Sequence, residues 1–155
     1  MAAIKSLIGA GWLKDSDDNF QSLASLAGFH ITKFTFDSAA NDAGSTPASN
    51  KTVAAHPMAV TIPDNAIVIG GHVDVIAAVT SDGSATIAIH LVNANDLFSA
   101  TSGAKANLTL AAQKPMATWT TPIKLEEEKA VTVTVGTAAL TAGKLDGYIL
   151  WMEGA

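Results

Sequence analysis

Residues Val60 to Leu91 read VTIPDNAIVIGGHVDVIAAVTSDGSATIAIHL, and this stretch decides the fold. It predicts three β-strands joined by two turns. The first strand ends at Ile62, and Pro63-Asp64-Asn65 has the composition of a tight turn, since proline presets φ and Asp and Asn side chains bond nearby backbone N–H groups. Ala66 to Val79 is then a second, longer strand, in which Gly70-Gly71 predicts a bulge or bend.

The second turn is Ser81-Asp82-Gly83-Ser84, and the third strand runs from Ala85 to Val92. Its side chains alternate, with Ile87, Ile89 and Leu91 on one face and Thr86, Ala88 and His90 on the other. A period of two is typical of a half-buried strand. No residue of the stretch from Val60 to Leu91 belongs to a recognisable catalytic motif, so function has to reside in the surface and in assembly.

Most of the remaining sequence continues the β pattern. Strands are expected at Phe29 to Asp37, Lys51 to Ile62 with an interruption at His56-Pro57, Met116 to Leu125 as one or two edge strands around Pro122, Val131 to Val135, and Leu145 to Met152, while Asn93 to Ala112 is ambiguous between a helical turn and an edge strand at 106–112. About eight strands with frequent turns indicate an all-β, jelly-roll-like β-sandwich over residues 29–155.

Residues 1–28 differ from the rest and are expected to form an N-terminal arm with one short helix. Asp17 or Asp18 is a suitable N-cap, apolar residues follow at helical spacing, and Gly28 ends the pattern. The apolar residues of this arm are too many for a solvated tail, and they need a partner surface on the sandwich of the same protomer or on another chain. They are Ile4, Leu7, Ile8, Trp12, Leu13 and Phe20.

Composition excludes several classes of function. The 155-residue chain is 48% hydrophobic and 15% charged, which suits burial in an assembly. All nine basic residues are lysines and the net charge is −5, so the bidentate guanidinium contacts used on phosphates and bases are missing and nucleic-acid binding is not expected. Cysteine is absent, no segment has the length of a membrane span, and the N-terminus lacks a convincing signal-peptide cleavage site.

Catalytic and metal-binding patterns also fail. Asp15, Asp17 and Asn19 have the spacing of a calcium loop, but Phe20 occupies the position that requires glycine. The four histidines, His30, His56, His72 and His90, form no close sequence pair, and no Gly-x-Ser-x-Gly or phosphate loop is present. We therefore expect no enzymatic activity, no cofactor and no metal site, with a pH-sensitive assembly contact as the minority hypothesis for the histidines.

The three tryptophans favour different environments. Trp119 lies in a threonine-rich segment that would suit an exposed sugar-binding platform, whereas Trp151 lies between Leu150 and Met152 and is expected in the core. Trp12 is the candidate intermolecular anchor, because tryptophan is enriched at interface hot spots and its arm has little core of its own.

Several stretches carry a resemblance to a known class of proteins. ITKFTFD, IPDNAIV, TSDGSATIAI and VTVTVGTAALTAGKLDGYILWME, within residues 30–153, are similar to the capsid decoration and head-fibre-like structural proteins of tailed bacteriophages. The resemblance implies a jelly-roll-like fold, frequent trimers and a position on the outside of a phage head.

The sequence therefore predicts a decoration or cement subunit that binds the outer surface of a phage head and stabilises it. The expected partners are the major capsid protein and other copies of the chain in a homotrimer, with no nucleic acid and no membrane. The six apolar arm residues are the candidate contacts to the capsid or to a neighbouring protomer. The expected location is the virion surface, after synthesis in the host cytoplasm. The alternatives are a phage tail or fibre adhesion module and a carbohydrate-binding β-sandwich.

Overall fold

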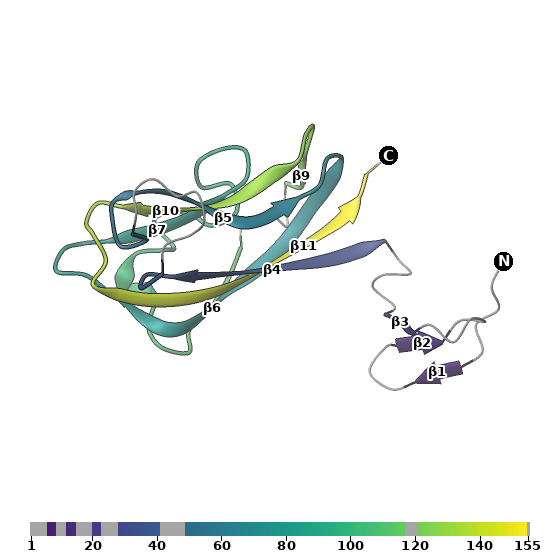
Figure 1. Cartoon of the computed structure of the whole chain (residues 1–155), viewed down its shortest axis with the longest axis horizontal. Helices are drawn as coiled ribbons and strands as arrows, with labels where there is room; N and C mark the ends of the chain where they lie inside the picture. The colour runs from purple at the N-terminus through teal and green to yellow at the C-terminus, as the bar shows by residue number, and fades with distance from the viewer. Residues whose placement is uncertain are drawn as a thin grey trace. The chain divides into compact units, whose positions relative to one another are not determined.

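The structure is a computed structural model, and it describes residues 6–8, 12–14, 20–22, 28–40, 49–116 and 121–154. The first three of these ranges are described as backbone. The chain divides into two compact units, Met1–His30 and Ile31–Ala155, and each is described by itself (Figure 1).

The first unit contains a small antiparallel sheet. Its strands are β1 (Ser6–Ile8), β2 (Trp12–Lys14) and β3 (Phe20–Ser22), in the order β1-β2-β3. Each strand is three residues long. The strands are antiparallel neighbours, as expected for segments joined by short connections.

The helix expected in the arm is wrong where the structure describes it. Phe20–Ser22 forms strand β3, in which Phe20 is opposite Lys14 and Ser22 is opposite Trp12. A helix of about ten residues is marginal without tertiary support, and Phe-Gln-Ser also alternates as a strand does, so pairing with β2 decides the outcome. The predicted caps at Asp17 and Asp18 and the residues 23–27 lie outside the described residues.

In the described part of the chain, eight strands follow. They are β4 (Phe29–Asp37), β5 (Ala54–Ile62), β6 (Ala66–Thr80), β7 (Thr86–His90), β8 (Gln113–Pro115), β9 (Ile123–Lys124), β10 (Lys129–Gly136) and β11 (Ala142–Glu153). They form two antiparallel sheets, one ordered β5-β10-β7 and one ordered β4-β11-β6-β8, with β9 also pairing with β6 (Figure 1). The predicted all-β sandwich of about eight strands is confirmed.

The order of the strands has the jelly-roll pattern. Successive strands β4, β5, β6 and β7 alternate between the two sheets. Of the later strands, β8 and β9 both pair with β6 in the larger sheet, β10 lies in the smaller sheet, and β11 returns to the larger sheet. The segment after β7 lies along its free edge through bridges from Ile89 to Phe98 and from Thr86 to Ala104, which supplies a fourth position in the smaller sheet. Two four-position sheets wound in this way are typical of a jelly roll.

The central strand β6 behaves as its sequence predicts. The turn before it has Asn65 at φ 59°, a left-handed conformation that asparagine tolerates. The register between β6 and β11 shifts between Leu150 and Trp151, opposite Gly70 and Val68, which confirms the bulge predicted from the glycine pair. Its pairing with β11 is the longest ladder of the sandwich.

The interruption predicted at His56-Pro57 is wrong, because β5 runs through both residues. Strand β5 lies at the edge of its sheet, where proline costs no ladder hydrogen bond if its nitrogen faces outward. The irregularity takes another form. The register with β10 shifts between Ala130, which pairs with Thr61, and Thr132, which pairs with Pro57.

The segment from Asn93 to Ala112 forms neither the expected helical turn nor the expected edge strand. It contains one short 3-10 helix, Lys105–Asn107, and no strand at residues 106–112. Backbone hydrogen bonds still attach it to β6, from Val75 N–H to the Ala112 carbonyl and from Val79 N–H to the Leu108 carbonyl. Across the described residues, no helix is long and apolar enough to cross a membrane.

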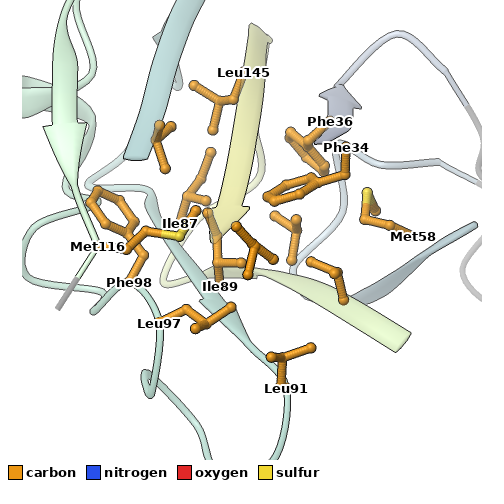
Figure 2. Close-up of a cluster of buried hydrophobic side chains, with 14 of the residues drawn as sticks. Phe34, Phe36, Met58, Ile87, Ile89, Leu91, Leu97, Phe98, Met116 and Leu145 are labelled. Atoms are coloured by element: carbon orange, nitrogen blue, oxygen red, sulfur yellow. The ribbon is translucent and has the colours of Figure 1, made fainter. Parts of the chain in front are cut away.

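The core fills the space between the two sheets (Figure 2). Its largest fully buried side chains are Phe36, Phe98, Ile62, Ile87, Ile89, Leu97, Leu108, Met116, Leu125, Leu145, Ile149 and His56. Most come from alternate positions of facing strands, as a sandwich requires. Trp151, predicted in the core, packs against it half-buried, and its indole N–H donates to Thr32 Oγ1 at 2.8 Å.

Candidate interaction surface

The outer face of the five-stranded sheet carries a group of interacting side chains. Each strand alternates, so the residues between buried positions point to this face. They are Ile31, Lys33 and Thr35 of β4, Asp146, Tyr148 and Leu150 of β11, and His72 and Asp74 of β6. The register places Tyr148 opposite His72 and Asp146 opposite Asp74.

An aromatic row crosses this face. The rings of His72 and Tyr148 are stacked, with centroids 4.7 Å apart and planes 16° from parallel. Lys33 Nζ lies 5.4 Å from the centroid of the Tyr148 ring, and Pro115 is opposite His72 on the other side of β6. The flat rings of Tyr148 and His72 therefore pair across neighbouring strands, with Lys33 and Pro115 on the strands to either side.

Charges beside the row are paired. Lys33 Nζ lies 2.6 Å from Asp146 Oδ2, and Thr35 Oγ1 donates to Asp146 Oδ1 at 2.7 Å. Burial raises the pKa of Asp146, but the hydrogen bonds from Lys33 and Thr35 lower it more, so its pKa lies below the ordinary value. The same hydrogen bond to Asp146 is the main cause that raises the pKa of Lys33.

A second ion pair lies at the end of the strands. Lys144 Nζ is 3.2 Å from Asp37 Oδ2. The pKa of Asp37 is lowered, chiefly because its carboxylate accepts the backbone N–H of Ala39, with a smaller effect of Lys144.

An apolar groove of about 400 Å³, here called the outer-face groove, lies next to the aromatic row. It is lined by Ile31, Gly71, His72, Pro115, Tyr148 and Leu150. Leu150 is opposite Gly70 in the ladder. Because glycine has no side chain, no side chain from this position fills the space beside Leu150. Ile31, which is 65% exposed, adds an apolar side chain to this lining.

A second apolar hollow, of about 340 Å³, lies further along β6. It is bordered by Ile76 and Leu110, which are 47% and 68% exposed, and by Asp74 and Gln113. Exposed apolar side chains therefore recur along one face of the molecule, which is the pattern of an interaction surface rather than of isolated exposed residues.

The outer face of strand β5 in the smaller sheet has a different character. Its exposed side chains are Ala55, Pro57, Ala59 and Thr61, all small and uncharged. Thr132 and Thr134 of β10 pair with Pro57 and Ala55. The exposed side chains of β5 therefore include no charged residue.

The structure places five of the six predicted arm residues in one sheet. Leu7 pairs with Leu13 and Ile8 with Trp12 between β1 and β2, and Phe20 begins β3. Ile4 lies outside the described residues, as does Trp119, the predicted sugar platform. Whether the arm residues bind a partner stays a prediction.

Sequence reasoning missed the outer-face groove. Its lining comes from strands that are far apart in the chain, so no local pattern joins Ile31 to Tyr148 or Pro115. The available signal was an isoleucine and a leucine at outward positions of strands whose other outward residues are polar. That signal becomes readable once the register of β4, β6 and β11 is known.

The histidines lie in four different strands, β4, β5, β6 and β7. His56 is fully buried, with Nε2 3.0 Å from the Thr52 carbonyl, whereas His72 is exposed in the aromatic row. Within the described ranges, no group of three or more His, Cys, Asp or Glu side chains is arranged to hold a metal ion.

No protein-family model matches the sequence, and no curated protein matches it. Solved structures share the fold. A chain in the cyanophage Pam1 capsid asymmetric unit aligns with a TM-score of 0.58 at 16% identity, over 97% of this chain and 92% of that one. A chain of the acidic stable capsid of Helicobacter pylori bacteriophage KHP30 aligns with a TM-score of 0.54 at 13% identity, over 82% and 89%. A chain of the capsid of Ralstonia phage GP4 aligns with a TM-score of 0.51 at 17% identity, over 81% and 86%.

Proposed function

We propose that the protein is a non-enzymatic structural subunit of a bacteriophage virion, and specifically a decoration or cement protein that binds the outside of the head. The observation that carries the proposal is the shared fold with chains of three phage capsids, over at least 81% of this chain and 86% of each of those chains. Nearly full mutual coverage supports a likeness of the whole fold rather than of one shared motif. Identities of 13–17% limit the comparison to fold, so the role also has to rest on the surface.

The surface supports a binding role. The outer-face groove and the hollow at Ile76 and Leu110 expose apolar area on one face, and the opposite sheet presents small uncharged residues that allow close approach of another surface. A subunit that buries such area across the seam between capsid proteins stabilises the assembled lattice and not the free subunits. Mass action then raises the stability of the filled head with each bound copy.

The major capsid protein is the proposed partner, and a homotrimer is the proposed state of the bound protein at the virion surface. Residues 1–28 are proposed as an arm that orders against a partner, with Ile4, Leu7, Ile8, Trp12, Leu13 and Phe20 as its contacts. Residues 29–155 are the sandwich domain to which the arm is attached. The apolar composition of the arm supports this division.

Carbohydrate binding receives less support from the site. Sugar recognition by stacking needs a free aromatic face, and both sides of the Tyr148 ring are approached, by His72 at 4.7 Å and by Lys33 at 5.4 Å. Stacking of a sugar ring on Tyr148 is therefore obstructed.

Binding to heads tests the proposal. Particles of the virus that carries this gene, stripped of the protein or made without it, are mixed with the purified chain, pelleted, and imaged by electron microscopy. The expected result is added density on the outer surface and a higher temperature of DNA release. Protein that stays in the supernatant and leaves the release temperature unchanged would contradict the proposal, and lysozyme in place of the protein controls for non-specific adsorption.

A further inference from the structure

The hollow beside Asp74 combines apolar walls with hydrogen-bond acceptors. It has a volume of about 340 Å³ and is here called the Asp74 hollow. Ile76 and Leu110 form its exposed apolar walls, while Asp74 and Gln113 contribute a carboxylate and an amide. Asp74 of β6 pairs with Gln113 of β8, and directly paired residues have Cβ atoms about 4.5–5.5 Å apart on the same face. One ligand group can therefore reach both side chains.

The two carboxylates that face each other on this sheet are unequally neutralised. Asp146 lies opposite Asp74, and it is bound by Lys33 Nζ at 2.6 Å and by Thr35 Oγ1 at 2.7 Å. Asp74 has no lysine partner among the described residues. Its carboxylate lies 3.7 Å from His72 Nε2, and that histidine is charged only when it is protonated. Because facing like charges destabilise a sheet, a cation at Asp74 would be favourable.

The Asp74 carboxylate also lacks hydrogen bonds. Its Oδ1 is buried and has no hydrogen-bond partner in the part of the chain that the structure describes, although the side chain as a whole is 26% exposed. A buried acceptor without a partner costs free energy. Rotation about the Cβ–Cγ bond of aspartate exchanges the two oxygens easily, so either oxygen can meet a donor at the exposed edge. The ligand should therefore be a cation that donates several hydrogen bonds.

The main chain holds the apolar wall in place. Ala111 N–H donates to the Val75 carbonyl, and Val75 N–H donates to the Ala112 carbonyl, both at 2.9 Å. Ala111 has φ 60°, a left-handed conformation that is uncommon for a residue with a Cβ atom. This turn fixes the segment to β6 and leaves Leu110 68% exposed at the hollow. A preformed wall of this kind suits the apolar stem of a long side chain.

An arginine side chain meets these requirements. Its planar guanidinium donates several N–H groups, binds carboxylates in a bidentate manner and is weakly hydrated, and its methylene stem packs on apolar surface. Lysine has the same charge, but its ammonium is a strongly hydrated point charge. The 155 residues contain no arginine, so the occupant has to come from a different protein and not from a second copy of them. The net charge of −5 favours the approach of a basic surface.

We propose that the Asp74 hollow binds an arginine side chain of a partner protein. The guanidinium donates to the Asp74 carboxylate and to the Gln113 amide oxygen, and the aliphatic stem lies against Ile76 and Leu110. The inference rests on the proposed function only in taking this partner to be a protein of the phage head.

Peptide titration tests the site without a phage head. Three blocked tripeptides carry arginine, lysine or norleucine between two alanines, and each is added to the full-length ¹⁵N-labelled protein at up to millimolar concentration. In NMR spectra, the arginine peptide should shift the amide signals of residues 74–76 and 110–113. The lysine peptide should bind more weakly, and the norleucine peptide, which has a stem without a charge, should bind most weakly.

A pair of variants isolates the carboxylate. Asp74→Asn should weaken binding of the arginine peptide by about fivefold, the effect of one exposed ion pair. Asp82→Asn changes the net charge equally at an exposed position that does not line the hollow, and it should bind as the parent does. Circular dichroism verifies that both variants fold. The inference is overturned by absent or misplaced shifts, by equal affinity for the arginine peptide and either other peptide, or by equal affinity of Asp74→Asn and the parent.

Head binding separates this inference from the proposed function. If the parent protein binds heads, Asp74→Asn should reach a lower occupancy than Asp82→Asn. Equal occupancy of the two variants would overturn the inference and leave head binding intact. A parent protein that does not bind heads would contradict the proposed function, and the peptide titration would then decide by itself whether the hollow binds arginine.

Discussion

At the scale of single residues, close packing against glycine makes some positions intolerant of any side chain. Gly147 of β11 lies under the Phe34 ring, and a Cβ at that position would overlap the ring atoms. Aromatic rings that cover a glycine on a neighbouring strand stabilise a sheet through this direct contact. Glycine is therefore required at Gly147 because of its neighbour and not because of its backbone conformation.

Gly147→Ala should destabilise the protein by about 1–3 kcal/mol, because the added methyl group overpacks a fully formed core. Urea unfolding measures the change. Phe34→Leu removes the atoms that the methyl group would meet, so the double variant should be less destabilised than the sum of the single variants. Simple additivity of the two effects would contradict the packing explanation.

The Asp146 carboxylate predicts a pH dependence. Its pKa is lowered in the folded protein, so its contribution to stability is present above the unfolded value of about 3.9 and is lost as pH falls through the folded pKa. Asp146→Asn should be less stable than the parent at pH 7, and the two should converge toward pH 2. Thermal unfolding at a series of pH values checks this, and a constant difference between pH 7 and pH 2 would be evidence against it.

At the scale of elements, one carboxylate organises the turn that follows β7. Asp96 Oδ1 accepts the backbone N–H of Leu91 at 3.0 Å, and Oδ2 accepts those of Val92 and Asn93, both at 2.9 Å. The turn delivers Leu97 and Phe98 to the core, where both are buried. After β7 ends at His90, this one carboxylate accepts the backbone N–H groups that a neighbouring strand would otherwise pair with.

Asp96→Ala should cost about 1–3 kcal/mol, because three N–H groups lose their acceptor and one of them is partly buried. Asp96→Asn keeps one acceptor oxygen and should fall between the parent and the alanine variant in chemical denaturation. Asp82→Ala, at an exposed position of the preceding turn, is the control and should change stability by less than about 0.5 kcal/mol. Equal effects of Asp96→Ala and Asp82→Ala would show that the turn does not depend on the carboxylate.

At the scale of the whole molecule, the sandwich has its own core between two sheets, and the described core residues all belong to the unit Ile31–Ala155. The sandwich should therefore be an independent folding unit. The arm is then expected to contribute to association more than to folding.

A protein that starts at Phe29 should keep the β-sheet circular dichroism spectrum of the full chain and lose its oligomers in light scattering. In the full chain, Trp12→Ala should weaken association by about 2 kcal/mol or more if Trp12 is an interface hot spot. Lys5→Ala, a polar position in the same arm, serves as the control. If the shortened chain unfolds, the arm is needed for folding. If it stays oligomeric, the interface lies on the sandwich and not on the arm.

The sequence by itself determined the elements whose pattern is local. Alternation predicted β4 from Phe29 to Asp37 with its observed bounds, and the glycine pair predicted the bulge in β6, because strand pleating and glycine geometry are properties of neighbouring residues. Where the sequence pattern was short or fitted both helix and strand, contacts with other parts of the chain determined the structure. Phe20–Ser22 is a strand because β2 is available to pair with it, and residues 106–112 are held by single hydrogen bonds to β6 rather than by a ladder.

The candidate site was decided by tertiary structure alone. Ile31, His72, Pro115 and Tyr148 meet because the jelly-roll winding places β4, β11, β6 and β8 side by side. Their separation along the chain leaves no periodic signal, and the register of each pair depends on the core contacts of the opposite face. Sequence patterns thus specify which residues face outward, whereas only the pairing of distant strands specifies which outward residues share a groove.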